Sequence, residues 1–222
     1  MTLTGARPSA AGGIMVVLAW VPRLVAVHLT WVVLVLMGAV VGGVAPATAT
    51  LVALLHGDED LGRATGPSAL AVAVLRRFRR ELVAANRAAG PFVVIALAAG
   101  LNVALAAAGA LPGWFFPAGF AASVVLLVIA TLAGFHAIAL HVLRPSAPAS
   151  TLWRGALAGV VLLPIATASW AITLAATLLI SVIVQPVALA CGGGILVAVT
   201  TIVLVRTWQS RLDDALPSGA GR

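Results

Sequence analysis

The side chains that could do chemistry within this chain are histidines and an amide rather than acids. Asn102, His136 and His141 lie in long apolar segments, and no Asp, Glu, Lys or Arg lies in the core of these segments. A polar or ionisable group in such a setting is a default candidate for a functional site. His136 and His141 are five residues apart, about 140° around a helix, which is a poor spacing for two ligands of one metal ion. We therefore expect both histidines to be hydrogen-bonded or interfacial. We expect Asn102 to bond across helices, with contact to a solute as its alternative.

The sequence predicts no catalytic residues, no cofactor and no metal site. It has no pair of carboxylates spaced for acid–base work and no recognisable set of Ser, His and an acid. Three adjacent acids, Asp58–Glu59–Asp60, are more typical of a solvated turn than of an ion site. Cys191 stands alone, so it cannot form an internal disulfide or a metal cage. These observations favour a protein that is not an enzyme.

Five apolar segments must position the polar residues: 24–44, 92–110, 114–143, 156–183 and 187–205. Each approaches or exceeds the roughly 20 residues that a helix needs to cross a bilayer. The chain of 222 residues is 62% hydrophobic and only 9% charged, whereas soluble domains carry about 25% charged residues. We predict an all-α, polytopic membrane helix bundle with about five transmembrane helices and a basic amphipathic interfacial helix.

The arginines predict how this bundle is oriented and divided. Every one of the 13 basic residues is arginine, as is typical of a GC-rich bacterial genome, and charge-rich loops alternate with charge-free ones. By the positive-inside rule, the N-terminus lies outside and the C-terminus in the cytoplasm of a bacterial inner membrane. Residues 1–23 are then a tail with a short interfacial helix, 24–206 the membrane domain with a basic cytoplasmic loop at 56–91, and 207–222 a cytoplasmic tail.

The loop is expected to contain a basic helix over residues 68–90. Val74, Phe78, Leu82 and Ala85 recur on one face, and Pro91 marks the restart into the second span. Such a helix is suited to lying on an anionic inner leaflet, with partner docking as an alternative, while no nucleic-acid module is recognisable. The predicted lipid or partner surface comprises Arg76, Arg77, Phe78, Arg79, Arg80 and Arg87.

Glycines and prolines indicate how the helices pack and bend. Gly38 with Gly42, and Gly155 with Gly159, form small-xxx-small pairs that allow close helix contacts. Pro46 and Pro164 predict kinks, because proline removes a backbone donor and clashes with the preceding turn. The segment after Pro46 either runs along the interface or extends the first span.

Two stretches resemble the YesL family of bacterial multi-span membrane proteins. They are His28–Leu29–Thr30–Trp31 and Val44–Ala45–Pro46–Ala47–Thr48–Ala49–Thr50–Leu51, and the basic segment Arg76–Arg77–Phe78–Arg79–Arg80 is also similar to that family's segment before its second span. The resemblance covers residues 24–110. His28 stands where the family usually has Asn, and Gly43 where it has Thr, so the chain resembles a divergent member. The resemblance implies no established activity, but it implies genes neighbouring those for carbohydrate uptake.

The sequence thus favours a non-enzymatic accessory protein of the inner membrane, associated with carbohydrate uptake or utilisation. A transport-competent, permease-like subunit that moves a small solute is the alternative. The expected partners are anionic lipids of the inner leaflet and sugar ABC transporter components, without nucleic acid. A homo-oligomer is also compatible with the sequence.

Overall fold

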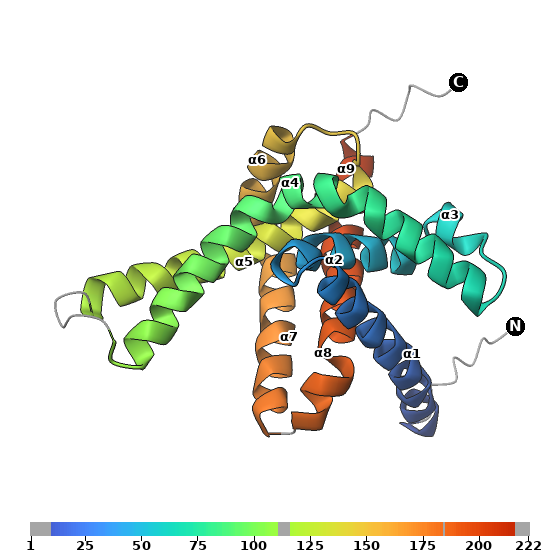
Figure 1. Cartoon of the computed structure of the whole chain (residues 1–222), viewed down its shortest axis with the longest axis horizontal. Helices are drawn as coiled ribbons and strands as arrows, with labels where there is room; N and C mark the ends of the chain where they lie inside the picture. Colours follow the sequence, from blue (N-terminus) through green and yellow to red (C-terminus); the bar gives the residue numbers. More distant parts are fainter. Residues whose placement is uncertain (1–9, 111–115, 184, 216–222) are drawn as a thin grey trace, which may run out of the picture.

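The computed structural model describes residues 10–110, 116–183 and 185–215, which form helices and connecting turns without a strand. The predicted all-α fold class is confirmed. Figure 1 shows the helices, which in chain order are α1 (Ala10–Met37), α2 (Val41–His56), α3 (Glu59–Gly62), α4 (Pro67–Ala107), α5 (Phe116–Leu143), α6 (Ala149–Leu162), α7 (Pro164–Ile183), α8 (Gln185–Val199), the π-helix η1 (Thr200–Val205) and α9 (Arg206–Asp214).

Long apolar helices dominate the molecule. Among the described residues, four helices are long and apolar enough to cross a membrane, and the bent pair α6–α7 makes a fifth if it is counted as one span. In Figure 1, α7, α8 and α1 point toward the lower end, the second half of α4 forms a hairpin with α5, and α6 and α9 lie at the upper end. This architecture is that of a multi-pass membrane protein.

The first apolar segment is broken earlier than Pro46. Helix α1 ends at Met37, and a turn follows in which Ala39 and Val40 have φ of 56° and 63°. A Cβ on Gly38 would lie 2.3 Å from the Cα of Gly43, so glycine is needed for this tight reversal. The predicted helix-packing pair of Gly38 and Gly42 is therefore wrong, because the two residues flank a turn.

Helix α2 is the centre of the bundle. Every residue from Ala45 to Ala53 is buried, and α2 contacts α1, α4, α5, α8 and η1. A kink or break was expected at Pro46, but α2 continues through this residue. The break in the apolar segment lies at residues 38–40, where the chain reverses. The segment after Pro46 is therefore a core helix packed by protein on several sides, neither an interfacial segment nor a continuation of α1.

Helix α4 joins two segments that the sequence appeared to separate. It runs for 41 residues without interruption, about 60 Å at 1.5 Å per residue, and includes Pro91 in its interior. The basic helix over 68–90 and the span at 92–110 are thus one element. Pro91 does not end the helix, and the Trp153 indole donates to the Arg87 carbonyl that Pro91 leaves open.

The bend expected at Pro164 is confirmed and is sharp. Helices α6 and α7 meet at 87°, so the expected fourth span, 156–183, is divided in the structure between the second half of α6 and α7. The pair Gly155 and Gly159 packs α6 closely, as predicted. A Cβ on Gly155 would come within 2.9 Å of Leu140 of α5, and one on Gly159 within 2.7 Å of Trp208 of α9.

Candidate functional site

The arginine-rich half of α4 has one face in the protein core and one face outside. Val74, Phe78 and Ala85 are buried, and Leu82 is half-buried against the same core. The predicted amphipathic face is thus confirmed as a helix face, but it packs on protein. Its apolar residues are covered by α2 and the neighbouring helices, and the expectation that the helix lies on an anionic leaflet stays a prediction.

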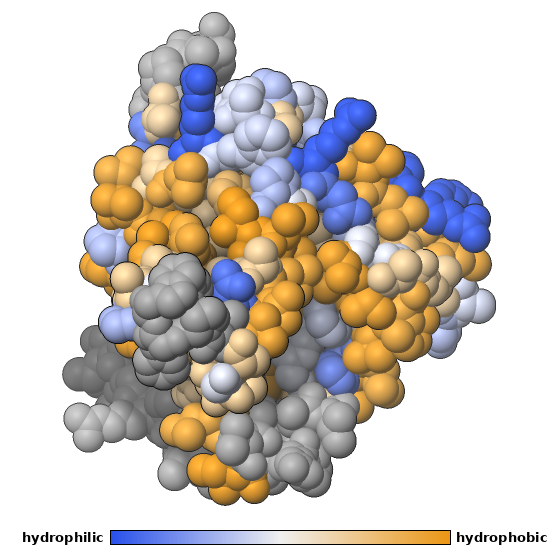
Figure 2. All heavy atoms as spheres, turned by 60° about the vertical axis from the view of Figure 1, so that its left-hand side comes forward, coloured by the Kyte–Doolittle hydropathy of each residue, from blue (hydrophilic) through white to orange (hydrophobic). Residues whose placement is uncertain are grey.

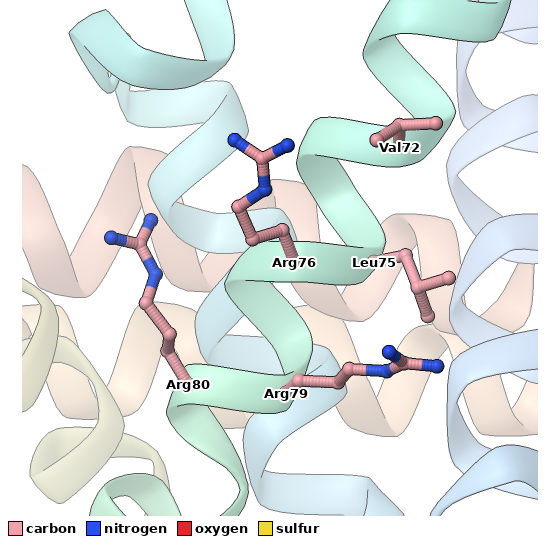
Figure 3. A pocket seen from close by; sticks show the side chains of 5 residues that line it. All are labelled: Val72, Leu75, Arg76, Arg79 and Arg80. Atoms are coloured by element: carbon pink, nitrogen blue, oxygen red, sulfur yellow. The ribbon is translucent and has the colours of Figure 1, made fainter.

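Four arginines remain exposed on the other side of α4, and we call them the arginine surface: Arg76, Arg79, Arg80 and Arg87. Figure 3 shows Arg76 and Arg80 pointing to one side of the helix, and Arg79 pointing to the other side beside Leu75. The three arginines in this view line a hollow of about 390 Å³ with Val72 and Leu75. No described carboxylate forms an ion pair with Arg76 or Arg79. The arrangement offers positive charge to an anionic group.

Arg77 and Phe78, which the sequence placed on the same surface, turn inward. The Arg77 Nη1 atom lies 2.6 Å from Asp58 Oδ2, and its Nε donates to Glu81 Oε1 at 2.8 Å. The other Glu81 oxygen, Oε2, lies 2.6 Å from His141 Nε2. Asp58, Arg77, Glu81 and His141 form an ionic cluster that joins the turn after α2 to α4 and α5.

The ionic cluster is built to hold helices in place. Glu81 and His141 are buried, and each Glu81 oxygen already has a partner. A contact to the carboxylate through His141 Nε2 requires the proton on that nitrogen. Removing one member of such a group leaves a buried charge or donor unpaired, which typically costs about 3–5 kcal/mol. The cluster therefore fixes the direction in which the arginine surface faces.

His136 of α5 belongs to a second group of hydrogen-bonded polar residues, which lies beside the bend between α6 and α7. Trp208 donates from Nε1 to His136 Nδ1 at 2.9 Å, and His136 Nε2 lies 3.0 Å from the Thr167 hydroxyl. Because the indole only donates, Nδ1 accepts and the neutral ring carries its proton on Nε2. The Thr167 hydroxyl in turn reaches the Gly159 carbonyl at 3.4 Å. Both histidines are thus hydrogen-bonded, to separate partners.

Asn102 is not the interhelical link that was expected. Its side chain is exposed on the outer part of α4, and no hydrogen bond joins it to another described residue. The amide that does link helices is Asn86, whose Nδ2 donates to the Gly42 carbonyl of α2 at 2.8 Å. The residues around Asn102 are apolar on every side of the helix, so the sequence did not indicate which face of α4 would pack against other helices.

The stretches that carry the family resemblance meet each other in the structure. The Trp31 indole donates to the Thr48 hydroxyl at 3.1 Å, which itself donates to the Val44 carbonyl at 2.7 Å. His28 Nδ1 accepts from the Gly193 backbone amide at 2.9 Å, joining α1 to α8. The two stretches thus form the contact between α1 and the central helix α2.

Residues 24–103 match the model of a family described as a protein of unknown function, DUF624. This DUF624-like segment comprises the second half of α1, all of α2 and α3, and α4 as far as residue 103. It therefore includes the Trp31–Thr48 contact, the arginine surface and three of the four residues of the ionic cluster. No curated protein and no solved structure matches the chain.

Sequence reasoning missed the ionic cluster and the tryptophan hydrogen bonds. The i, i+4 spacing of Arg77 and Glu81 was a usable signal for one ion pair on a helix. Asp58 lies 19 residues before Arg77, and His141 lies 60 residues after Glu81. No spacing in the sequence indicates such distant contacts, because they depend on how α2, α4 and α5 pack.

Proposed function

We infer that this is a non-enzymatic, multi-pass protein of a bacterial inner membrane, and that it serves as an accessory component docking a protein partner through Arg76 and Arg80. The observation that carries the inference is the rigid mounting of these side chains. The opposite face of α4 is buried, and the ionic cluster clamps the same turns of the helix. Because the core and the ionic cluster hold α4 in place, Arg76 and Arg80 can bind an acidic partner while the buried face of α4 stays packed. Such a charged surface is suited to electrostatic docking.

The orientation supports docking on the cytoplasmic side. Figure 2 shows hydrophilic residues gathered mainly at the upper end of the molecule, the end that carries α6 and α9 in Figure 1, and hydrophobic residues over most of the remaining surface in this view. The described part of α1 begins at the opposite end from α9. With the arginine-rich end inside, the N-terminus lies outside and the C-terminus in the cytoplasm.

The association with carbohydrate uptake rests on the resemblance to the YesL family. The residues that carry it, from His28 to Arg80, fall within the DUF624-like segment. A partner from such a system, the ATPase or a permease of a sugar ABC transporter, would present acidic groups to Arg76 and Arg80. The proposal thus names both the kind of partner surface, which is acidic, and the residues of this chain that bind it.

The test is co-purification of the tagged full chain from its own membranes in gentle detergent, followed by mass spectrometry. We expect a sugar-uptake permease or ATPase to be recovered, and recovery to fall at least fivefold for the double variant Arg76→Gln/Arg80→Gln. The matched control is Arg206→Gln/Arg211→Gln, which removes the same charge from exposed positions on α9. Equal recovery from both double variants, or recovery of the chain alone, contradicts the proposal.

A transport-competent subunit that moves a small solute is a second candidate, favoured by the bend between α6 and α7. Broken helices line the solute sites of many transporters, and here the 87° bend lies beside the hydrogen bonds of His136 and Thr167. This candidate predicts uptake by the chain alone in liposomes, with loss of uptake for Thr167→Val. Absence of uptake with correctly folded protein contradicts it.

A further inference from the structure

A second hollow lies on the α1 side of α4, away from Arg76 and Arg80. It is a groove of about 500 Å³, within the size range of small-molecule sites of about 300–1,000 Å³. One wall is the end of α1, with Leu29, Val33 and Met37, and the other is the start of α4, with Ala71 and Leu75. The lining is almost wholly apolar, and α1 is one of the helices long and apolar enough to span a membrane.

The groove is continuous with positive charge at one end. Leu75 lines both this groove and the hollow beneath the arginines. Arg79 follows Leu75 by four residues, which places both on the same face of α4, and Figure 3 shows the two side chains extending to the same side. No ion pair with a described carboxylate occupies the Arg79 guanidinium. A single path along α4 therefore leads from the positive charge of Arg79, past Leu75, into the apolar groove between α1 and α4.

We propose that this path is a binding site for one anionic phospholipid, with its phosphate on Arg79 and an acyl chain in the groove between α1 and α4. The amphipathic order of the site, a guanidinium followed by apolar walls, matches the order of a phospholipid from headgroup to chain. The guanidinium fork is suited to two phosphate oxygens.

The site is independent of the partner-docking function. It uses the side of α4 that Arg79 faces, whereas docking is assigned to Arg76 and Arg80, which point the other way. Failure of one proposal therefore leaves the other standing.

The experiment is native mass spectrometry of the purified full chain in neutral detergent, titrated with dioleoyl phosphatidylglycerol. We expect saturable binding of a first lipid, stronger than that of dioleoyl phosphatidylcholine, and no retention of glycerol 3-phosphate, which lacks the chains. Arg79→Gln should weaken the first binding step about fivefold, since an arginine near an anionic lipid contributes about 1 kcal/mol. Ala71→Phe, which fills the groove, should weaken it by at least as much.

Each variant has a matched control on the same helix. Arg87→Gln removes an exposed arginine outside the site, and Ala98→Phe adds the same bulk to an exposed position away from the groove. Both should bind phosphatidylglycerol as the unaltered chain does. The proposal is overturned if Arg79→Gln behaves like Arg87→Gln, if Ala71→Phe behaves like Ala98→Phe, or if the two phospholipids bind equally.

Discussion

At the scale of single residues, indole and hydroxyl groups satisfy polar atoms in otherwise apolar surroundings. Four tryptophans donate their indole N–H across the bundle: Trp31 to Thr48, Trp153 to the Arg87 and Ala88 carbonyls, Trp170 to Thr200, and Trp208 to His136. Thr50 is the contrast. It is fully buried in α2, and its hydroxyl has no hydrogen-bond partner among the described residues. Neighbouring threonines on one helix thus differ in what they contribute.

Substitution of each threonine by valine should separate these roles. Thr48→Val removes the acceptor of the Trp31 indole and leaves that half-buried donor unpaired, so we expect a loss of about 1–3 kcal/mol in the free energy of unfolding. Thr50→Val removes an unpaired hydroxyl at nearly constant volume, so we expect no loss and a gain of up to about 1 kcal/mol. Equilibrium unfolding in mixed micelles measures both. Equal destabilisation by the two substitutions would contradict this account.

At the scale of helices, prolines inside α2 and α4 are tolerated because distant side chains take over the missing hydrogen bonds. Pro46 cannot donate to the Gly42 carbonyl four residues earlier, and Asn86 donates to it instead. Pro91 likewise leaves the Arg87 carbonyl open, and the Trp153 indole donates there at 3.0 Å. Each proline thus creates the acceptor by which its helix binds a neighbouring one.

A double-mutant cycle tests this coupling for α2 and α4. Asn86→Leu should cost about 1–3 kcal/mol, because the Gly42 carbonyl is left without a donor. In the Pro46→Ala background, the new backbone N–H of residue 46 can bond to Gly42, so the cost of Asn86→Leu should fall. The expected interaction energy is about 0.5–3 kcal/mol, measured by unfolding of the four proteins. Additive effects would show that Asn86 acts independently of the proline.

At the scale of the whole molecule, charge separates the two ends. The arginine surface, α6 and α9 lie toward one end, and the start of α1 lies toward the other (Figure 1). A cytoplasmic position for the arginine-rich end is the orientation that the positive-inside rule favours. This orientation has a direct consequence for which side of the membrane each surface residue reaches.

Labelling of single cysteines by a membrane-impermeant maleimide tests the orientation. In a Cys191→Ser background, Pro117→Cys at the start of α5 should react in spheroplasts, whose inner membrane is intact. Ser68→Cys and Arg211→Cys should react only after the membrane is opened. All three positions are exposed, so accessibility to the reagent depends on the side of the membrane. Labelling of Ser68→Cys before opening would place the arginine surface outside and contradict the topology.

The sequence by itself determined the helical membrane architecture, the basic half of α4 and the bend at Pro164. These follow from hydropathy, charge and proline chemistry, which are properties of consecutive residues. The same local reasoning failed at residues 38–40 and at Pro91. The tight reversal depends on the close approach of Gly38 and Gly43, and the continuity of α4 coincides with a hydrogen bond from Trp153, 66 residues away from Arg87.

Only the tertiary structure decided which polar residues meet. Packing of α2 against α4 and α5 brings Asp58, Arg77, Glu81 and His141 together. It turns Arg77 away from its neighbours and leaves Arg79 on the same side of α4 as Leu75, which lines the α1–α4 groove. In an apolar bundle a buried donor or acceptor without a partner is costly, but which partner it meets is set by helix contacts rather than by spacing along the chain. The positive charge of α4 was therefore readable from the sequence, whereas the direction in which each arginine points was not.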